Sequence, residues 1–386
     1  MRSTRFLPAI ITVAFLACGL QAQTKQVNPV ITSVPSLAIT PDARAAAMGN
    51  LGVASSADYY AQYWNPAKYA STTAKSGAYI GYTPWLSKLT DGIALMNIGG
   101  FYKLPSGTDQ TISASLRYFS TGKMIQWDDM LNKVGQVSAS ELAFDIAYSR
   151  RLSASFSMAA ALRYIHADPG IQREGIGKGH AFAMDIAGYM DKPIYLFKQD
   201  MRWRAGFNIK NIGTKISFDG GSHKGFIPTN LGLGTGLSMA LAPAHALEVN
   251  VELNKLLVPT PPMYDPKSSE LRDKAFADYY KTSALAGIFK SLGDAPGGFS
   301  EEMKEILWNA GMEYAYRQMF FARMGYSYIH PDKGAMQLFG FGAGVRYNGF
   351  TVDAAYQIAT TPNNALDGTF SITLAVEPEQ LKNLWE

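Results

Sequence analysis

The stretch Asn230 to Ala242 reads NLGLGTGLSMALA and decides the fold. It is uncharged, but it is shorter than the ~20 apolar residues that a membrane-spanning helix needs. Its large apolar residues share one parity and its small residues take the other: Leu231, Leu233, Leu237, Met239 and Leu241 against Gly232, Gly234, Gly236, Ser238 and Ala240. A period of two is the period of a β-strand with one apolar and one small-residue face.

The same alternation recurs along most of the chain. In one example, Val249 and Val251 alternate with Glu248 and Glu252. The pattern predicts fourteen strands, near residues 76–87, 91–103, 110–120, 139–150, 152–165, 178–190, 201–211, 229–242, 245–255, 308–316, 320–329, 337–347, 349–358 and 369–376. A soluble β-sandwich also alternates. However, strands of about ten residues in an even number are typical of a bacterial membrane barrel.

The connections between these strands alternate between short and long. The short ones include Arg150-Arg151, Pro243-Ala244 and Asn348-Gly349, and the long ones are 121–138, 166–177, 212–228, 256–307 and 359–368. Outer-membrane barrels have short periplasmic turns and long outer loops. We therefore expect the N-terminus and the short turns on the periplasmic side. Tyrosines on the apolar face before three short turns indicate an aromatic girdle at the lipid headgroups: Tyr148, Tyr316 and Tyr347.

The first residues predict secretion. Arg2 and Arg5 precede an apolar run from Phe6 to Leu20, which is typical of a signal peptide covering residues 1–22. Lipidation at Cys18, the only cysteine of the chain, remains an alternative. The expected location is the outer membrane of a Gram-negative bacterium, with the signal peptide cleaved.

Two segments depart from the strand pattern, and each is assigned a separate role. Residues 23–75 are small and polar, with a helix-compatible stretch from Asp42 to Met48, and we interpret them as a hatch inside the barrel of residues 76–376; a periplasmic tail is the alternative. The outer insertion 256–307 predicts two helices, Ser268 to Leu292 and Ser300 to Leu307. Residues 377–386 form a C-terminal tail.

No pattern of catalytic, metal-ligating or cofactor-binding residues emerges, so we expect neither an enzyme, nor a metal site, nor a cofactor. The five histidines are scattered, and the net charge of +4 gives no case for nucleic-acid binding. The glycines between Gly340 and Gly344 have the period of a small-residue strand face rather than that of a phosphate-binding loop. Charges expected inside the lumen are interpreted as salt-bridge partners, with a conduction pathway as the alternative: Glu141, Asp145, Arg202, Arg204, Glu248 and Glu252.

Large apolar side chains on the outer loops are the candidate partner-binding residues, because aromatic anchors supply much of the energy of protein interfaces. They are Ile125, Trp127, Met130, Tyr264, Tyr279, Tyr280 and Phe289.

The stretch Ala43 to Ala70, ARAAAMGNLGVASSADYYAQYWNPAKYA, resembles the N-terminal signature of FadL-like barrels, with Met48-Gly49 ahead of an Asn65-Pro66-Ala67 turn. Within that superfamily the chain is most similar to the PorV-type outer-membrane barrels of the type IX secretion system. The motifs that carry the similarity are PSLAITPDARAAAMG, YWNPAK, GYTPWL and FSITLAV. The resemblance covers essentially the whole mature chain. It implies a fourteen-stranded barrel with an N-terminal hatch, in which Asn65, Pro66 and Ala67 form the hatch turn.

The resemblance also implies a function and partners. A PorV-type protein binds the C-terminal domain of secreted cargo at a large outer-membrane translocon barrel and delivers it to a sortase-like attachment complex on the cell surface. Two other classes stay open. One is a FadL-like transporter of hydrophobic small molecules, and the other is an enzyme that modifies lipid A.

Overall fold

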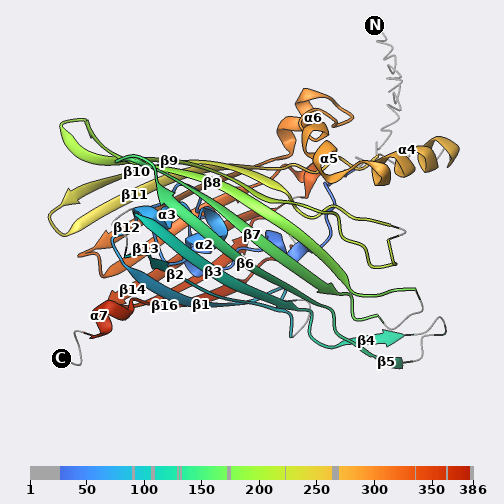
Figure 1. The fold of residues 1–386 in the computed structure, drawn as a ribbon, viewed down its shortest axis with the longest axis horizontal. Coiled ribbons are helices and arrows are strands. Elements are labelled where there is room, and N and C mark those ends of the chain that lie inside the picture. The colour runs from blue at the N-terminus through green and yellow to red at the C-terminus, as the bar shows by residue number, and fades with distance from the viewer. Residues whose placement is uncertain are drawn as a thin grey trace, which may run out of the picture.

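The computed structural model describes residues 27–88, 92–105, 109–127, 130, 133–171, 175–221, 223–262, 269–334, 336–361 and 364–382. Fourteen antiparallel strands form a closed barrel, which β1 (Ser76–Pro84) and β16 (Thr369–Val376) close by pairing with each other (Figure 1). The strands between them are β2 (Ala94–Lys103), β3 (Gln110–Ser120), β6 (Ser140–Arg151), β7 (Phe156–Asp168), β8 (Gly179–Leu196), β9 (Gln199–Gly213), β10 (Asn230–Ala242), β11 (His245–Leu256), β12 (Ile306–Tyr316), β13 (Phe320–Tyr328), β14 (Gln337–Tyr347) and β15 (Phe350–Ala359). The predicted number of strands and the predicted closed barrel are confirmed.

Two features of the wall were not predicted. The loop after β3 contains a separate hairpin of β4 (Met124–Trp127) and β5 (Lys133–Val137). In addition, β8 and β9 pair as far as Leu196 and Gln199, so a β-hairpin takes the place of the expected loop around residues 191–200. Sequence periodicity missed this extension because the residues after Asp191 no longer alternate in polarity.

The two faces of the wall differ as the alternation predicts. On β15, Val352 and Tyr356 are exposed on the outside, whereas Asp353 and Gln357 are buried in the lumen. The outer face of a membrane barrel meets lipid, so exposed apolar residues are expected there. Tyr148 and Tyr347 are exposed on this face next to short turns, as the girdle requires.

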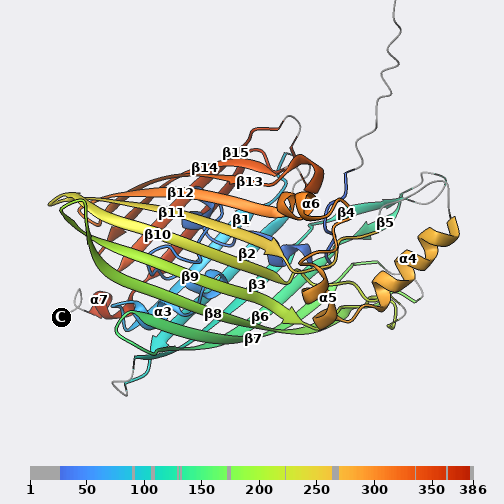
Figure 2. The same cartoon turned by 90° about the horizontal axis from the view of Figure 1, so that it is seen from above.

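The two ends of the barrel are unlike each other. The end that carries β4, β5 and the helices α4 (Ser269–Lys281), α5 (Ala284–Lys290) and α6 (Phe299–Lys304) is called the loop end (Figures 1 and 2). The opposite end carries the short turns and α7 (Pro378–Lys382), and is called the turn end. The predicted helix from Ser268 to Leu292 is wrong as a single element. Ser283 separates α4 from α5, because its side chain caps α5 by accepting a hydrogen bond from the Ala286 N–H.

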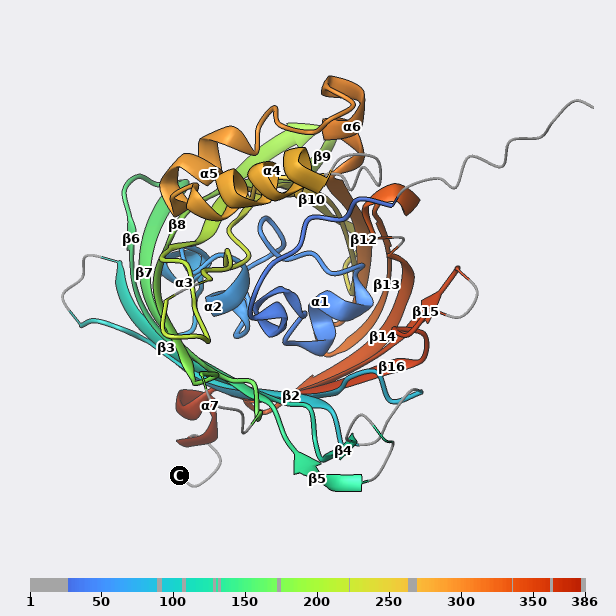
Figure 3. The ribbon, with the colours of Figure 1, turned by 90° about the vertical axis from the view of Figure 1, so that its right-hand side faces the viewer.

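The segment before β1 lies inside the lumen, so the tail alternative is wrong. It contains η1 (Pro35–Ala38), α1 (Ala43–Ala47), α2 (Ala61–Trp64) and α3 (Lys68–Ser71), which a view from the loop end shows within the ring of strands (Figure 3). We call residues 27–75 the hatch. None of the helices in the described residues is long and apolar enough to cross a bilayer.

The hatch enters the barrel from the loop end. The Asn28 N–H donates a hydrogen bond to the Asp332 carbonyl at 3.0 Å, and the Ser33 N–H donates to the Phe226 carbonyl at 2.7 Å. Both acceptors lie in connections at the loop end. The expectation of an N-terminus on the side of the short turns is therefore wrong for the described chain, because the hatch runs the length of the lumen before β1 begins at the turn end.

Candidate functional site

Glycines on the lumen face let the hatch touch the wall directly. A Cβ atom on Gly340 would lie 2.3 Å from the Ala46 carbonyl oxygen, and one on Gly325 would lie 2.1 Å from the Met48 carbonyl carbon. Both neighbours are backbone atoms of α1 and its C-cap, so they cannot move aside alone. The small-residue face that the sequence predicted for β14 is thus the surface on which α1 packs.

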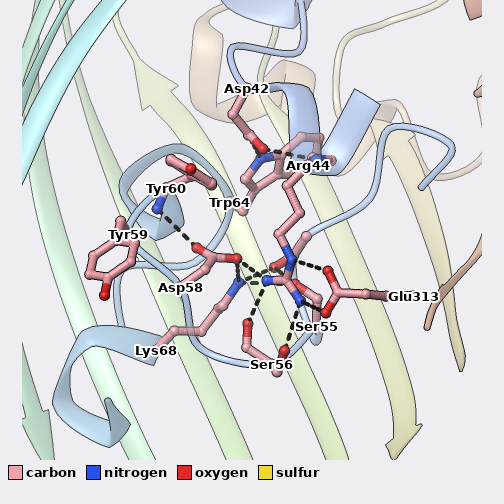
Figure 4. Close-up of polar contacts among 12 residues, drawn as sticks. Asp42, Arg44, Ser55, Ser56, Asp58, Tyr59, Tyr60, Trp64, Lys68 and Glu313 are labelled. Atoms are coloured by element: carbon pink, nitrogen blue, oxygen red, sulfur yellow. Dashed lines mark hydrogen bonds and ion pairs between the residues drawn. The ribbon is translucent and has the colours of Figure 1, made fainter. Parts of the chain in front are cut away.

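Arg44 of α1 is the centre of a buried ionic network (Figure 4). Its guanidinium donates to Glu313 of β12 from Nε at 2.8 Å and from Nη2 at 3.0 Å. Nη1 donates to the Asp58 carboxylate at 2.5 Å. Glu313 in turn accepts a hydrogen bond from Nε of Arg323 at 2.6 Å. One hatch arginine therefore joins a hatch loop to the barrel wall.

Lys68 of α3 joins the same ionic network. Its side chain is fully buried, and its Nζ donates to the Asp58 carboxylate at 3.1 Å and to the Ser55 hydroxyl at 3.0 Å. Burying such charges is favourable only when they are paired and hydrogen-bonded. The partners of Arg44 and Lys68 meet this condition, so the network holds the hatch in one position.

The turn of Asn65, Pro66 and Ala67 lies between α2 and α3, and Asn65 is fully buried. Its side-chain amide donates to the carbonyls of Val53 and Gly188, each at 2.9 Å, and its Oδ1 accepts from the Ala67 N–H at 3.1 Å. One asparagine therefore ties two segments of the hatch to β8. Its observed contacts are structural.

Several other lumen charges are also paired or hydrogen-bonded. Arg163 donates to Asp185 at 2.9 Å and to Asp145 at 3.3 Å, and Asp145 also accepts from the hatch side chain Gln62 at 2.5 Å. Glu141 accepts from the Ser36 N–H at 3.0 Å. Among the predicted lumen charges, Arg202 differs, because it is exposed at the turn end next to Asp191. These pairings match the salt-bridge interpretation of the lumen.

The hatch lies between two hollows of the lumen. The hollow at the turn end has an empty volume of about 1050 Å³ and is lined by the charged residues Arg202, Arg204, Glu248 and Glu313 among others. The one at the loop end has an empty volume of about 1030 Å³, which includes space open to solvent. We call this second hollow the loop-end cavity. Its lining includes Leu37, Ile39, Tyr63, Trp64, Trp85, Lys210, Asn230, Asn254, Leu256, Leu307, Ile329, Met336, Leu338 and Gln357.

The predicted partner-binding residues divide into three groups. Ile125, Met130, Tyr280 and Phe289 are exposed at the loop end, and Phe289 is 76% exposed. Trp127 lies in β4, whereas Tyr264 lies outside the described residues. The expectation that Tyr279 is exposed is wrong: it is 9% exposed, because its ring packs against Phe226 at a centroid distance of 5.4 Å.

Sequence reasoning missed most of the exposed apolar surface of the loop-end helices. Leu285, Phe289 and Leu292 are all more than half exposed. Their spacing of four and three residues places them on one side of α5 and its C-terminal end. Phe299 and Met303 on α6 are exposed as well. We call these five residues the cap patch. The spacing of Leu285, Phe289 and Leu292 is visible in the sequence. It does not reveal that they are exposed, because an apolar stripe buried against the barrel has the same spacing.

Ion pairs hold α6 against the barrel. Glu305 accepts hydrogen bonds from Nζ of Lys255 and Nζ of Lys333, each at 2.9 Å, and Lys255 also binds Glu302 at 2.7 Å. Burial acts to raise the pKa of Glu305, but the two lysine ammonium groups outweigh it and hold that pKa below the ordinary value. The part of the cap patch on α6 is therefore presented on a fixed support.

Several histidine contacts were not anticipated, among them a pair of histidines, His166 and His180, whose Nδ1 atoms lie 3.3 Å apart. Nδ1 of His223 lies 2.5 Å from the Asp219 carboxylate, four residues earlier in the same loop. Among the described residues, no group of three or more His, Cys, Asp or Glu side chains could hold a metal ion.

Comparisons with known proteins give one matching family and several solved structures with a similar fold. The family model described as "Type IX secretion system protein PorV" matches residues 21–263, which is more than half of the chain. No curated protein sequence matches. The solved structures with a similar fold include the Pseudomonas putida toluene transporter TodX, with 12% identity, 91% of this chain and 98% of that chain covered, and a TM-score of 0.47. They also include a Pseudomonas aeruginosa FadL homologue, with 9% identity, 91% and 99% coverage, and a TM-score of 0.42.

Proposed function

This chain belongs to the PorV family of type IX secretion system proteins, and from that premise we propose that it is a shuttle in the outer membrane. It binds the C-terminal domain of secreted cargo at the large translocon barrel and delivers it to the sortase-like attachment complex on the cell surface. In this proposal the loop end faces the outside and the turn end faces the periplasm.

The cap patch is the observation that carries the proposal. Five large apolar side chains on α5, its C-terminal end and α6 are exposed at the end of the barrel that presents the long loops. Groups of exposed large apolar side chains mark interaction sites on proteins that are otherwise polar at their water-facing ends. Because ion pairs hold α6, its share of the patch can bind without a large ordering cost.

The state of the lumen supports a carrier rather than an open pore. The Arg44 network and the packing of α1 on lumen glycines hold the hatch across the barrel between its two hollows. A binding protein needs only its loop end, whereas a pore would have to move these buried charges.

An affinity-tagged copy purified from its native membrane tests the proposal. We expect it to capture secreted proteins that retain their C-terminal domains, together with a large translocon barrel. Capture should be lost when the C-terminal domain of the cargo is removed. Recovery of no secreted protein with an intact C-terminal domain would refute the shuttle.

The loop-end cavity favours a second candidate function, transport of hydrophobic small molecules. Its walls are mainly apolar and carry a few polar groups, as the walls of ligand pockets do. Transport would require the hatch to move, so this candidate predicts impaired uptake after deletion of residues 27–75 and unchanged cargo attachment.

A further inference from the structure

The loop-end cavity opens toward the same side as the cap patch. Four residues of its lining, Trp85, Leu256, Ile329 and Met336, lie at or next to the loop-end termini of β1, β11, β13 and β14. Tyr63 and Trp64 of the hatch lie at its inner side. The bordering ladders from β11 to β14 pair without a register shift, whereas the β8–β9 ladder shifts register between Met184 and Ile186, next to Lys210. The strand termini around the cavity place its mouth at the loop end, where a ligand can enter.

The inner side of the cavity holds a buried ammonium group. Lys210 of β9 is 8% exposed, and its Nζ lies 3.7 Å from the ring centroid of Tyr63 and 5.3 Å from that of Trp64. Among the described residues it forms no ion pair within 4 Å with a carboxylate, although the charge of Glu252 acts on it from further away. Glu252 accepts from the N–H groups of Gly52 and Val53, each at 2.8 Å.

A second cation lies against the same ring. The guanidinium carbon of Arg117 is 4.3 Å from the Tyr63 centroid, and its Nη1 donates to the Ser36 carbonyl at 2.9 Å. Arg117 is 5% exposed and likewise forms no ion pair with a described carboxylate. Glu305, the acid in the cavity lining, is neutralised by Lys255 and Lys333. Of the two cations only Lys210 lines the cavity. A buried cation without an ion-pair partner is costly, so this end of the cavity favours an anion.

The walls indicate what the anion is attached to. The lining combines apolar side chains with amide and hydroxyl groups, which hydrogen-bond to one another in pairs and which a ligand would have to engage: Thr40, Asn50, Asn230, Asn254, Gln357 and Ser371. The apolar side chains of a peptide would contact the apolar part of the lining, and its backbone N–H and C=O groups would hydrogen-bond to the amide and hydroxyl groups. An alkyl chain would use only the apolar part.

We propose that the loop-end cavity binds the carboxyl-terminal residues of a polypeptide held on the cap patch, with the terminal carboxylate paired to Lys210. Capture of a chain terminus is a known mode of peptide recognition. The inference rests on the proposed shuttle function, and adds that the protein reads the free end of its cargo.

Two synthetic octapeptides test the inference on the whole protein in detergent. Both have the sequence Ser-Gly-Thr-Gly-Val-Leu-Val-Leu, one ending in a free carboxylate and one in a carboxamide. Calorimetry should show at least tenfold tighter binding of the free acid. Equal affinities, or binding of neither peptide, would overturn the proposal without needing any variant.

Variants assign the effect to one residue. Lys210→Met should abolish the preference for the free acid, and Lys210→Arg should restore most of it. Lys192→Met, at an exposed lysine of the turn-end hairpin, should leave the preference unchanged. A preference that survives in Lys210→Met would place the carboxylate elsewhere and overturn the assignment.

Dodecanoate is the probe for a lipid occupant. If it binds the cavity and neither peptide competes with it, the anion is a lipid and the peptide inference fails. Failure here remains distinct from failure of the shuttle. A tagged wild-type protein that captures secreted cargo but shows no acid preference refutes only the inference, whereas the absence of captured cargo refutes the shuttle.

Discussion

Arg44 and Glu313 are 269 positions apart, yet they form a two-point ion pair inside the lumen, with Nε–Oε2 and Nη2–Oε1 distances of 2.8 and 3.0 Å. The arginine belongs to the first α-helix of the hatch and the glutamate to β12, near the turn end of the wall. Their contact makes the hatch and the barrel one structure.

Glu313→Gln should destabilise the protein strongly. The substitution leaves Arg44 and Arg323 buried with one negative charge fewer, and breaking a buried pair costs about 3–5 kcal/mol. Denaturant unfolding in detergent should show a lower free energy of unfolding, and trypsin should cleave within the hatch sooner. Glu379→Gln, which removes an exposed pair with Lys75 at 3.5 Å, is the matched control and should change neither measurement.

Gly340→Leu should displace the hatch while the strands still close. Any Cβ at this position meets the backbone of α1 at 2.3 Å. In planar bilayers we expect the wild type to be closed and the variant to conduct ions. Gly177→Leu is the control, since no heavy atom lies within 4 Å of a Cβ at Gly177. A variant as closed as the wild type would mean that α1 can shift without opening the lumen.

Much of this architecture could be predicted from the sequence, and the reason is physical. Lipid outside and polar groups inside impose a period of two on every strand, so NLGLGTGLSMALA identifies β10 and its boundaries. The β8–β9 extension beyond Asp191 does not alternate in polarity, so the period of two could not reveal it. Long-range contacts such as Arg44 with Glu313 leave no local pattern. Tyr279 and Tyr280 are neighbours of the same type, and only the packing against Phe226 makes one buried and the other exposed.

Phe289→Asp should reduce cargo capture at least tenfold without unfolding the protein. The side chain is 76% exposed on α5, so its replacement removes apolar contact area but no core packing. Affinity purification followed by quantification of secreted proteins measures the effect. Phe197→Asp changes an aromatic residue of similar exposure at the turn end and should capture cargo normally. Equal capture by both variants would remove α5 from the binding surface.

Tyr279→Ala should release α4 from the barrel, because the ring packs with Phe226 and Val258 in one buried cluster. Removing a buried aromatic ring costs about 3–5 kcal/mol. Hydrogen exchange of α4 should become faster, while the barrel strands keep their protection. Tyr280→Ala, at the exposed neighbour, should leave the exchange of α4 nearly unchanged.

Acid should loosen the attachment of α6. The pKa of Glu305 in the folded protein lies below its ordinary value of 4.5. The stabilisation by its ion pairs is therefore complete above pH 4.5 and is lost as the pH falls through the folded-state pKa. A spin label at Phe299→Cys should become more mobile below pH 4.5. A label at Tyr195→Cys on the turn-end hairpin should not respond, and Glu305→Gln should raise the mobility at neutral pH.

The entry of the hatch from the loop end constrains the order of assembly. Along the sequence, the chain runs from the neighbourhood of Asp332 through the lumen to the opposite rim, where its first strand, β1, begins. If β1 and β16 paired first, the whole hatch would have to thread lengthwise through the closed ring, so closing the seam between Ala78 and Val376 around a hatch already in place is the shorter route. On this route β16, the last strand to be synthesised, closes the barrel after its lumen has been filled.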